Sequence, residues 1–297
     1  MLTNHVDVAN HLVDNMTFYR VHNSDISVLI GPDSLDLLHS VTTQSVNDLK
    51  ENSSIFASIL NSNGRMIDRI LIWNLGDQIA IIHLDGCSDS TRILLSKSVS
   101  WKQDVKIIPL DSGFSSLWVY DSLDSSEPFL VSIDDQVHSC YINNGIYVHL
   151  GPNSEINKLQ SKMNASGISL IQNQDLRLFK IMNGQIDGEI VQTFNPIPLE
   201  VSLSDDISFT KGCYTGQEII ARMDARGSLS RTLVTFSSNN EISSGNNRIV
   251  GGGKLVSYDS MSLDNKWMNL GLIHPDFSDV GTEFVIDDSI CTIITKW

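Results

Sequence analysis

The amino-acid sequence predicts an α+β fold, followed at its end by a small β-barrel or sandwich. Two observations carry this prediction: hairpin-linked strands mix with isolated helices up to residue 228, and helical periodicity stops from Arg231 onward. A doubly wound parallel sheet would instead require strands and helices in regular alternation. The 297 residues exceed one minimal core and suffice for two or three compact units. We therefore expect a domain boundary near residues 228–232.

The first elements of the chain are a strand, a helix and a meander. The segment "DISVLIG" is apolar and strand-like, and the leucines of the following "DSLDLLHSVTTQ" recur at helical spacing. Residues 55–84 hold strongly apolar stretches that are separated by Asn-Gly and Gly-Asp pairs. These pairs favour tight hairpin turns, so we expect a β-meander there.

The later elements follow the same mixture until the helices end. We expect a helix over 88–99, short strands to about residue 150, and another helix near 154–165. After Arg231 the closely spaced strand signals are "RTLVTFSS", "RIVGGGKLVSY", "KWMNLGLIH", "TEFVIDD" and "CTIITKW". Short strands at such spacing are typical of a small barrel or sandwich.

The charge and the apolar pattern exclude several classes of function. Twenty basic and 35 acidic residues give a net charge of −15, which disfavours binding to nucleic acid or to an anionic membrane. The first twenty residues lack a signal-peptide pattern, and no stretch is long and apolar enough for a membrane helix. We expect a soluble, cytoplasmic protein that contacts neither nucleic acid nor membrane directly.

Cysteine and histidine spacing gives no support for a metal site. The four cysteines are far apart in the sequence, and the eight histidines form no HExxH or HxH cluster. In a reducing cytosol a disulfide framework is improbable, and zinc sites usually need paired ligands. We therefore assign no metal-binding residue.

The segment "FTKGCYTGQEIIARM" places one cysteine beside the start of a helix. Thr215 and Glu218 have the spacing of a capping box, and Gly227 can end a helix that runs from about residue 216 to 226. Cys213 would then lie at the positive end of the helix dipole and near Lys211, and both favour a thiolate. The alternative is that Cys213 is a small residue that packs in a tight turn.

This segment is also locally basic in an acidic chain. Residues 211–231 hold Lys211, Arg222, Arg226 and Arg231 against two acidic residues. One interpretation is an anion site, because the planar fork of arginine matches a carboxylate. The other is an ordinary ion pair between Glu218 and Arg222, four residues apart on a solvated helix face.

The string "KGCYTGQE", residues 211–218, is similar to the signature of the YgfZ family, folate-binding relatives of the glycine-cleavage T protein (GcvT). Further segments follow in the order of that family: "LLHSVTTQSVNDL", "LNSNGRMIDRILIW", "DLRLFKIMNGQIDGEI", "IPLE" and "SFTKGCYTGQEIIAR". The resemblance covers nearly the whole chain. It is closest to the mitochondrial and α-proteobacterial branch of iron–sulfur assembly proteins.

The resemblance implies a GcvT-like body over residues 1–230, built of two intertwined α+β subdomains with a folate channel, and a β-barrel over 231–297. It implies a tetrahydrofolate-binding protein that supports assembly or repair of iron–sulfur clusters, with tRNA-modifying radical-SAM enzymes among its clients. The implied partners are a folate, the iron–sulfur assembly machinery and client 4Fe–4S proteins, and the implied state is a monomer. A folate-binding regulator without chemistry is a weaker possibility.

The resemblance also implies roles for individual residues. Glu200 matches the pterin-binding glutamate of the T protein, and a carboxylate can accept the two adjacent N–H groups of a pterin edge. Asp68 matches one member of an aspartate pair, with a catalytic and a folate-binding role. The remaining assignments are a reactive thiol at Cys213 with Lys211 beside it, and folate contacts from Tyr214, Gln217 and Arg222, with Arg226 or Arg231 as alternatives for the tail.

Each of these assignments has a structural alternative. Glu200 could be a solvated loop residue, Asp68 could pair with a neighbouring arginine, and Arg177 could be a structural ion-pair partner. One departure from the family pattern concerns the chemistry: Arg69 stands where the T protein has its second aspartate. Aminomethyl transfer needs a carboxylate near the folate nitrogens. This departure favours an assembly factor over the other function, a folate-dependent aminomethyltransferase or demethylase.

Overall fold

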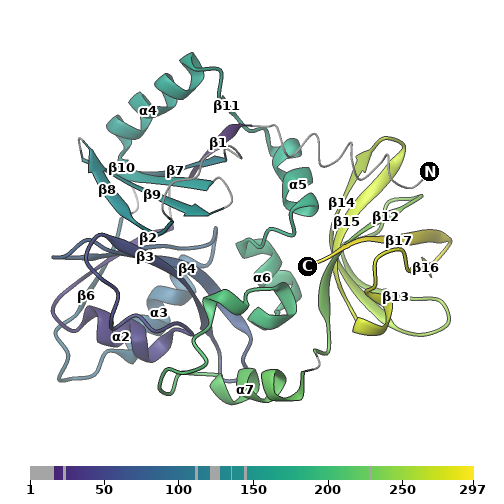
Figure 1. Cartoon of the computed structure of the whole chain (residues 1–297), viewed down its shortest axis with the longest axis horizontal. Helices are drawn as coiled ribbons and strands as arrows, with labels where there is room; N and C mark the ends of the chain where they lie inside the picture. The colour runs from purple at the N-terminus through teal and green to yellow at the C-terminus, as the bar shows by residue number, and fades with distance from the viewer. Residues whose placement is uncertain are drawn as a thin grey trace.

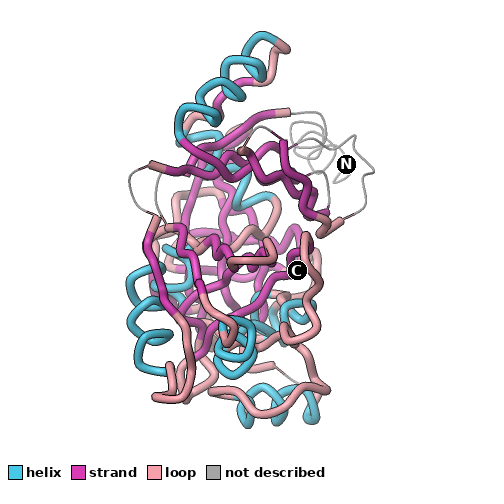
Figure 2. Tube along the Cα trace, turned by 90° about the vertical axis from the view of Figure 1, so that its left-hand side faces the viewer, coloured by secondary structure: helices cyan, strands magenta, loops and turns pink. Residues whose placement is uncertain are grey.

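A computed structural model describes residues 17–22, 25–110, 113–120, 128–134, 136–143, 146–227 and 229–297. Three sheets carry this part of the chain (Figure 1). Figure 2 shows the strands in the middle of the molecule, with helices above and below them. The expected α+β class is confirmed, because hairpins dominate and the helices stand singly between them.

The first sheet has the strand order β3-β4-β5-β2-β6. Its strands are β2 (Ile26–Ile30), β3 (Ser53–Leu60), β4 (Met66–Asn74), β5 (Ile79–Ile82) and β6 (Lys106–Pro109). Helices α2 (Ser34–Val41) and α3 (Ser88–Ser98) cover one face. Ile70 and Ile72 of β4 pack in the cluster with these helices, whereas Leu71 and Trp73 pack toward the second sheet. The two-residue period of a strand thus supplies two apolar faces.

The second sheet has the order β11-β1-β7-β10-β9-β8. Its strands are β1 (Phe18–His22), β7 (Phe114–Tyr120), β8 (Val131–Asp134), β9 (Val137–Asn143), β10 (Ile146–Pro152) and β11 (Ser169–Leu170). Helix α4 (Asn153–Ala165) packs on its outer face through Ile156, against Tyr19, Leu117 and Val119. The inner face packs against the first sheet through residues such as Val148 and Leu150.

A helical segment joins the two sheets to the third one. It comprises α5 (Asn173–Met182), α6 (Gly188–Phe194), the short 3-10 helices Pro198–Val201 and Ser204–Asp206, and α7 (Gln217–Arg226). Its apolar side chains form one cluster with the ends of β3 and β4 and with the outer face of the third sheet. Helices α5 and α6 lie between the first two sheets and the third one, and α7 lies at the lower edge of the view in Figure 1.

The third sheet curls, as the sequence predicts for a barrel. Its strands are β12 (Thr232–Ser238), β13 (Gly245–Arg248), β14 (Lys254–Leu263), β15 (Lys266–Ile273), β16 (Glu283–Ile286) and β17 (Ser289–Lys296). The order is β13-β14-β15-β12-β17-β16, and an isolated bridge between Ile249 and Ile286 joins the two edges. Secondary structure changes from helix to sheet between Arg226 and Thr232. That this change is a domain boundary stays a prediction.

Candidate functional site

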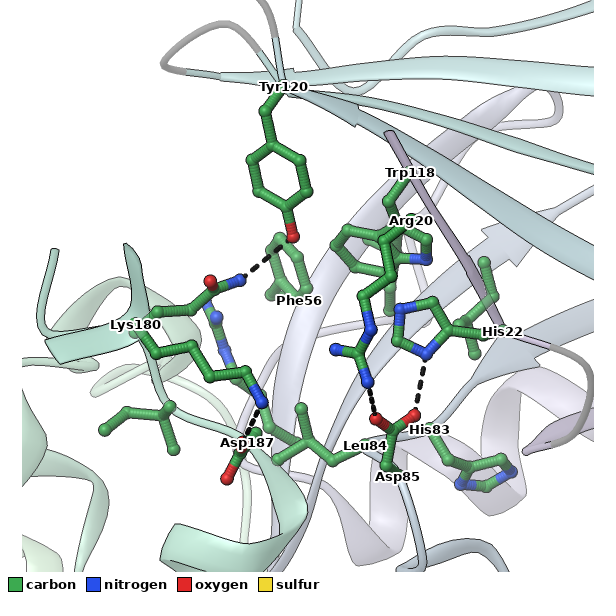
Figure 3. Close-up of a pocket in the computed structure, with 15 residues that line it drawn as sticks. Arg20, His22, Phe56, His83, Leu84, Asp85, Trp118, Tyr120, Lys180 and Asp187 are labelled. Atoms are coloured by element: carbon green, nitrogen blue, oxygen red, sulfur yellow. Dashed lines mark hydrogen bonds and ion pairs between the residues drawn. The ribbon is translucent and has the colours of Figure 1, made fainter. Parts of the chain in front are cut away.

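The candidate functional site is a cavity where the first two sheets meet the segment before α6 (Figure 3). It encloses about 60 Å³ and opens to solvent. Its lining combines aromatic rings with charged groups: Arg20, His22, Phe56, Arg69, Leu71, Ile82, His83, Leu84, Asp85, Trp118, Tyr120, Lys180, Gln185, Ile186 and Asp187. Apolar and aromatic surface together with convergent polar groups is typical of a small-molecule site.

One end of the cavity holds a cluster around Asp85. Arg20 and His22 are two positions apart on β1, so the pleat directs both side chains toward the cavity. The Arg20 guanidinium donates to Asp85 Oδ2, and His22 Nδ1 lies 2.6 Å from Asp85 Oδ1. Burial acts to raise the pKa of Asp85, but the hydrogen bonds and charges of His22 and Arg20 hold it well below its ordinary value. Asp85 is therefore an ionised carboxylate at the cavity wall.

The opposite end holds a second ion pair. Lys180 of α5 donates to Asp187 Oδ2, and both side chains are largely buried. Asp187 is also the N-cap of α6, where its Oδ1 accepts the backbone N–H of Ile190 at 2.9 Å. Tyr120 closes this end, with its hydroxyl accepting from Gln185 Nε2 at 3.2 Å. Burial raises the pKa of Tyr120, so this phenol stays protonated.

Arg69 forms part of the wall between these ends. Its Nε lies 2.6 Å from Asp206 Oδ2 and its Nη2 lies 3.0 Å from Oδ1, a bidentate pair. The guanidinium also lies 4.0 Å from the centroid of the Phe56 ring. Arg69 is therefore an ion-paired cation that stacks on an aromatic ring.

Asp68 does not reach the cavity and is fully buried. Its Oδ2 lies 2.7 Å from His83 Nδ1 and accepts from Thr91 Oγ1, and its Oδ1 accepts the backbone N–H of Leu84. The alternative of a pair with a neighbouring arginine is wrong. Asp68 instead belongs to a closed network behind the cavity wall, where His83 connects it to the lining.

Glu200 is fully buried, so the alternative of a solvated loop residue is wrong. Its Oε2 accepts from Arg65 at 2.8 Å, from Arg231 at 2.6 Å and from the backbone N–H of Ile197 at 3.1 Å. Its Oε1 accepts from Ser230 at 2.9 Å and from Arg231 Nε at 3.0 Å. Both oxygens are thus occupied by protein donors, and a pterin edge would have to displace them.

The loop before α7 carries Lys211, Cys213 and Tyr214. The Lys211 ammonium donates to the carbonyl oxygens of His39, Thr42 and Gln44, so its donors face the end of α2. Burial lowers the pKa of Lys211 to about 8. Cys213 is exposed, and Tyr214 is buried with its ring 5.3 Å from the Lys211 ammonium. Lys211 thus holds the loop in place.

The expected capping box of α7 is wrong. The N-cap is Gly216, with φ of 83°, and its position carries no side-chain cap. Helix α7 begins at Gln217, and its C-cap is Gly227, in agreement with the expected stop. Glu218 instead accepts from Arg222 at 2.7 Å on the exposed face, so the ion-pair interpretation of these two residues is confirmed.

The structure therefore separates the residues that the sequence singled out. In the described part of the chain, the lining of the cavity includes none of Asp68, Glu200, Lys211, Cys213, Tyr214, Gln217 and Arg222. Arg177 forms a bidentate pair with Asp259 of β14, as its structural alternative predicts. Arg231 belongs to the Glu200 network, and Arg226 is exposed.

Sequence reasoning missed the cavity residues Arg20, His22, Asp85, Lys180 and Asp187. Two signals were available. The strand "FYRVH" alternates its charged residues on one face, and Lys180 interrupts the apolar face of an amphipathic helix. No local pattern, however, indicates that these elements meet around one cavity.

Comparisons with known proteins agree with this fold. The chain is 25% identical over 276 residues to the "tRNA-modifying protein YgfZ" of Blochmanniella pennsylvanica, covering 87% of this chain and 82% of that protein. It is 22% identical over 236 residues to the "Iron-sulfur cluster assembly factor IBA57 homolog, mitochondrial" of Mycosarcoma maydis, covering 73% of this chain and 56% of that protein. No family model matches the chain.

A solved structure shows the same architecture. The glycine cleavage system aminomethyltransferase T from Bartonella henselae superposes with a TM-score of 0.76 at 12% identity, covering 98% of this chain and 88% of that one. Among the described residues, no helix has the length and apolar character that a membrane crossing needs.

Proposed function

Because the chain is homologous to the YgfZ and IBA57 proteins and has the aminomethyltransferase T fold, we propose that it is a tetrahydrofolate-binding protein. In this proposal it supports assembly or repair of iron–sulfur clusters in client enzymes, including tRNA-modifying radical-SAM enzymes. The observation that carries the proposal is the central cavity, which combines aromatic rings with groups of both charges. The cytoplasmic location and the monomeric state stay predictions.

The lining fits the chemistry of a folate. A pterin presents a flat ring with N–H donors, and Phe56, Trp118 and Tyr120 supply aromatic surface beside the carboxylate of Asp85. The glutamate tail of a folate carries carboxylates, for which Lys180 supplies a cation at the end of the cavity opposite Asp85, in a chain of net charge −15. Bound tetrahydrofolate would supply nitrogens that carry one-carbon units.

The chain's own residues bind and orient this ligand. The ion pairs of Asp85 and Asp187 keep the polar groups fixed before binding, which reduces the entropy cost of association. Cys213 is exposed and lies outside the cavity lining, so a contact with an assembly partner or a cluster would occur at the surface. An iron–sulfur cluster is then cargo that passes over this surface.

Binding of 5-formyltetrahydrofolate, measured by titration calorimetry, tests the folate part of the proposal. Arg20→Ala is expected to weaken binding about tenfold, because it removes the partner that holds the Asp85 carboxylate in place at the cavity wall. Arg222→Ala is the matched control, because this arginine lies on the exposed face of α7. Absence of binding to the unaltered protein would reject the folate assignment.

The assembly part is tested in a strain that lacks the gene. We expect the unaltered protein to restore the activity of 4Fe–4S enzymes and Cys213→Ser to restore it poorly. Full rescue by Cys213→Ser would reject a role for the thiol, and failure of the unaltered protein to rescue would reject the assembly role.

The second candidate is an aminomethyltransferase or demethylase of the T-protein type, which the shared fold favours. Against it stands Arg69, a cavity residue where the resemblance implies a second aspartate. Arg69 is held there by its bidentate pair with Asp206. We expect little production of methylene-tetrahydrofolate from an aminomethyl-lipoyl donor. Rapid production in that assay would favour the transferase.

A further inference from the structure

We propose that Asp85 is the carboxylate of the cavity that contacts the ligand, and that Asp68 is a positioning residue that acts through it. The inference rests on the proposed function, since it names the acceptor for the N–H donors of the folate. It follows from a contrast between two aspartates, one closed behind the cavity wall and one open to the cavity.

The closed carboxylate is Asp68. It is fully buried, and three donors from His83, Leu84 and Thr91 occupy its two oxygens. His83 and Leu84 belong to the wall of the cavity, and the His83 side chain is itself fully buried. Asp68 therefore has no direct path to a ligand.

The open carboxylate is Asp85. Its side chain is 39% exposed and points into the cavity. Arg20 bonds to Oδ2 and His22 to Oδ1, so each oxygen has one partner. A carboxylate offers about four acceptor positions in total. Asp85 thus keeps acceptor capacity toward the cavity, while its neighbours hold it ionised and fixed in direction.

The backbone around Asp85 is held from both sides. The N–H of Leu84 donates to Asp68 Oδ1 at 3.1 Å, and the N–H of Gly86 donates to Asp25 Oδ2 at 3.2 Å. Asp85 lies between these two attachments, so its carboxylate depends on them for its position. Asp68 is one of the two anchors of this turn.

A buried network fixes the anchor itself. His83 Nε2 lies 2.8 Å from Ser27 Oγ, which in turn accepts from Arg92 Nε at 2.9 Å. With Ser27 donating to Nε2, the other ring nitrogen of His83 carries the proton and donates to Asp68. The spacing resembles a serine–histidine–aspartate triad, but all three side chains are buried, so they serve as a support and not as a nucleophile.

The test is calorimetric binding of 5-formyltetrahydrofolate to single and double variants. Asp85→Asn keeps the size of the side chain and removes its charge, and we expect binding to weaken about tenfold. Asp68→Asn should weaken binding by a smaller factor and should have no further effect once Asp85 is Asn, because it acts only through Asp85. Asp224→Asn, on the exposed face of α7, is the control.

The outcomes separate the inference from the proposed function. If the unaltered protein binds no folate, the proposed function and the inference both fail. If it binds and Asp85→Asn binds equally well, only the inference fails. Additive losses in the double variant would show that Asp68 acts independently of Asp85, which rejects the positioning role. If Asp68→Asn does not fold, His83→Gln tests the same attachment, with the same non-additivity expected.

Discussion

The four cysteines differ in exposure, and this difference orders their reactivity. Cys87, Cys140 and Cys291 are buried, whereas Cys213 is exposed. Burial raises the pKa of Cys87 to about 12 and that of Cys291 to about 11, and it also raises the pKa of Cys140. The thiolate is the reactive form of cysteine. The three buried thiols should therefore react slowly, because a reagent cannot reach them and because they stay protonated.

We therefore expect one fast-reacting thiol when the folded protein meets a disulfide reagent at pH 7. Cys213→Ser should remove the fast phase and leave the thermal unfolding temperature nearly unchanged, because this side chain is exposed. The measurement is the absorbance of the released thiolate against time. A fast phase that persists in Cys213→Ser would contradict the prediction.

Individual residues were predicted less well than their segments. The sequence singled out Glu200, but its partners Arg65 and Arg231 lie 135 and 31 residues away along the chain. Asp68 likewise meets Thr91 through the packing of α3 against β4. A side chain's neighbours are set by tertiary packing, and no local pattern in one sequence contains them.

At the scale of elements, the start of α7 and the hairpin between β3 and β4 form one close contact. A Cβ at Gly216 would lie 2.7 Å from the Asn61 carbonyl oxygen and 2.9 Å from the Gly64 Cα. A Cβ at Gly64 would lie 2.9 Å from the Ile219 Cβ. Two segments of the resemblance, residues 60–73 and 208–222, thus meet through two glycines.

Gly216→Ala should therefore destabilise the protein more than Gly227→Ala. Both glycines have positive φ, at 83° and 61°, but a Cβ at Gly227 meets nothing within 4 Å. The left-handed conformation costs alanine about 1 to 2 kcal/mol at either position, and backbone overlap adds about 1 to 3 kcal/mol at Gly216. Urea unfolding of both variants gives the comparison, and equal losses would show that the contact at Gly216 relaxes without cost.

The sequence predicted most elements because their signals are local. The meander over 55–84 and the strands after Arg231 appear as expected, since alternation and turn residues are properties of neighbouring positions. The parallel pairing of β1 with β11 was not predicted, because Phe18 and Ser169 are distant in the chain. The N-cap of α7 was mispredicted because the hairpin, and not a side chain, fixes its backbone.

At the scale of the whole molecule, Glu200 joins three parts of the chain. Arg65 directly precedes β4, Ile197 directly precedes the 3-10 helix, and Arg231 directly precedes β12. Burial acts to raise the pKa of Glu200, but the hydrogen bond and charge of Arg231, with Ile197 and Arg65, hold it below its ordinary value. The third sheet is thereby attached to the body through an ionised buried group.

Glu200→Ala should lower the free energy of unfolding by about 3 to 5 kcal/mol, because it leaves two arginines beside a cavity without their acceptor. The pKa is lower in the folded state, so the stabilisation is fully present above the unfolded value of 4.5 and is lost as pH falls through the folded value. Glutamine does not titrate, so the free energy of unfolding of Glu200→Gln should fall less than that of the unaltered protein as the pH is lowered from 6. The measurement is the urea midpoint of both proteins over this pH range. Parallel pH curves would contradict this.

The cavity takes its residues from distant parts of the chain, and this sets an order of events in biosynthesis. Arg20 and His22 belong to an early strand, whereas Lys180 and Asp187 leave the ribosome much later, so the cavity is complete only after α5 and the start of α6 have been made. Contacts between such distant positions form slowly, because a long loop must close first. The cavity should consequently be complete only late in refolding, after the first sheet has formed. Any ligand of the cavity would then bind finished molecules in preference to truncated or half-folded ones.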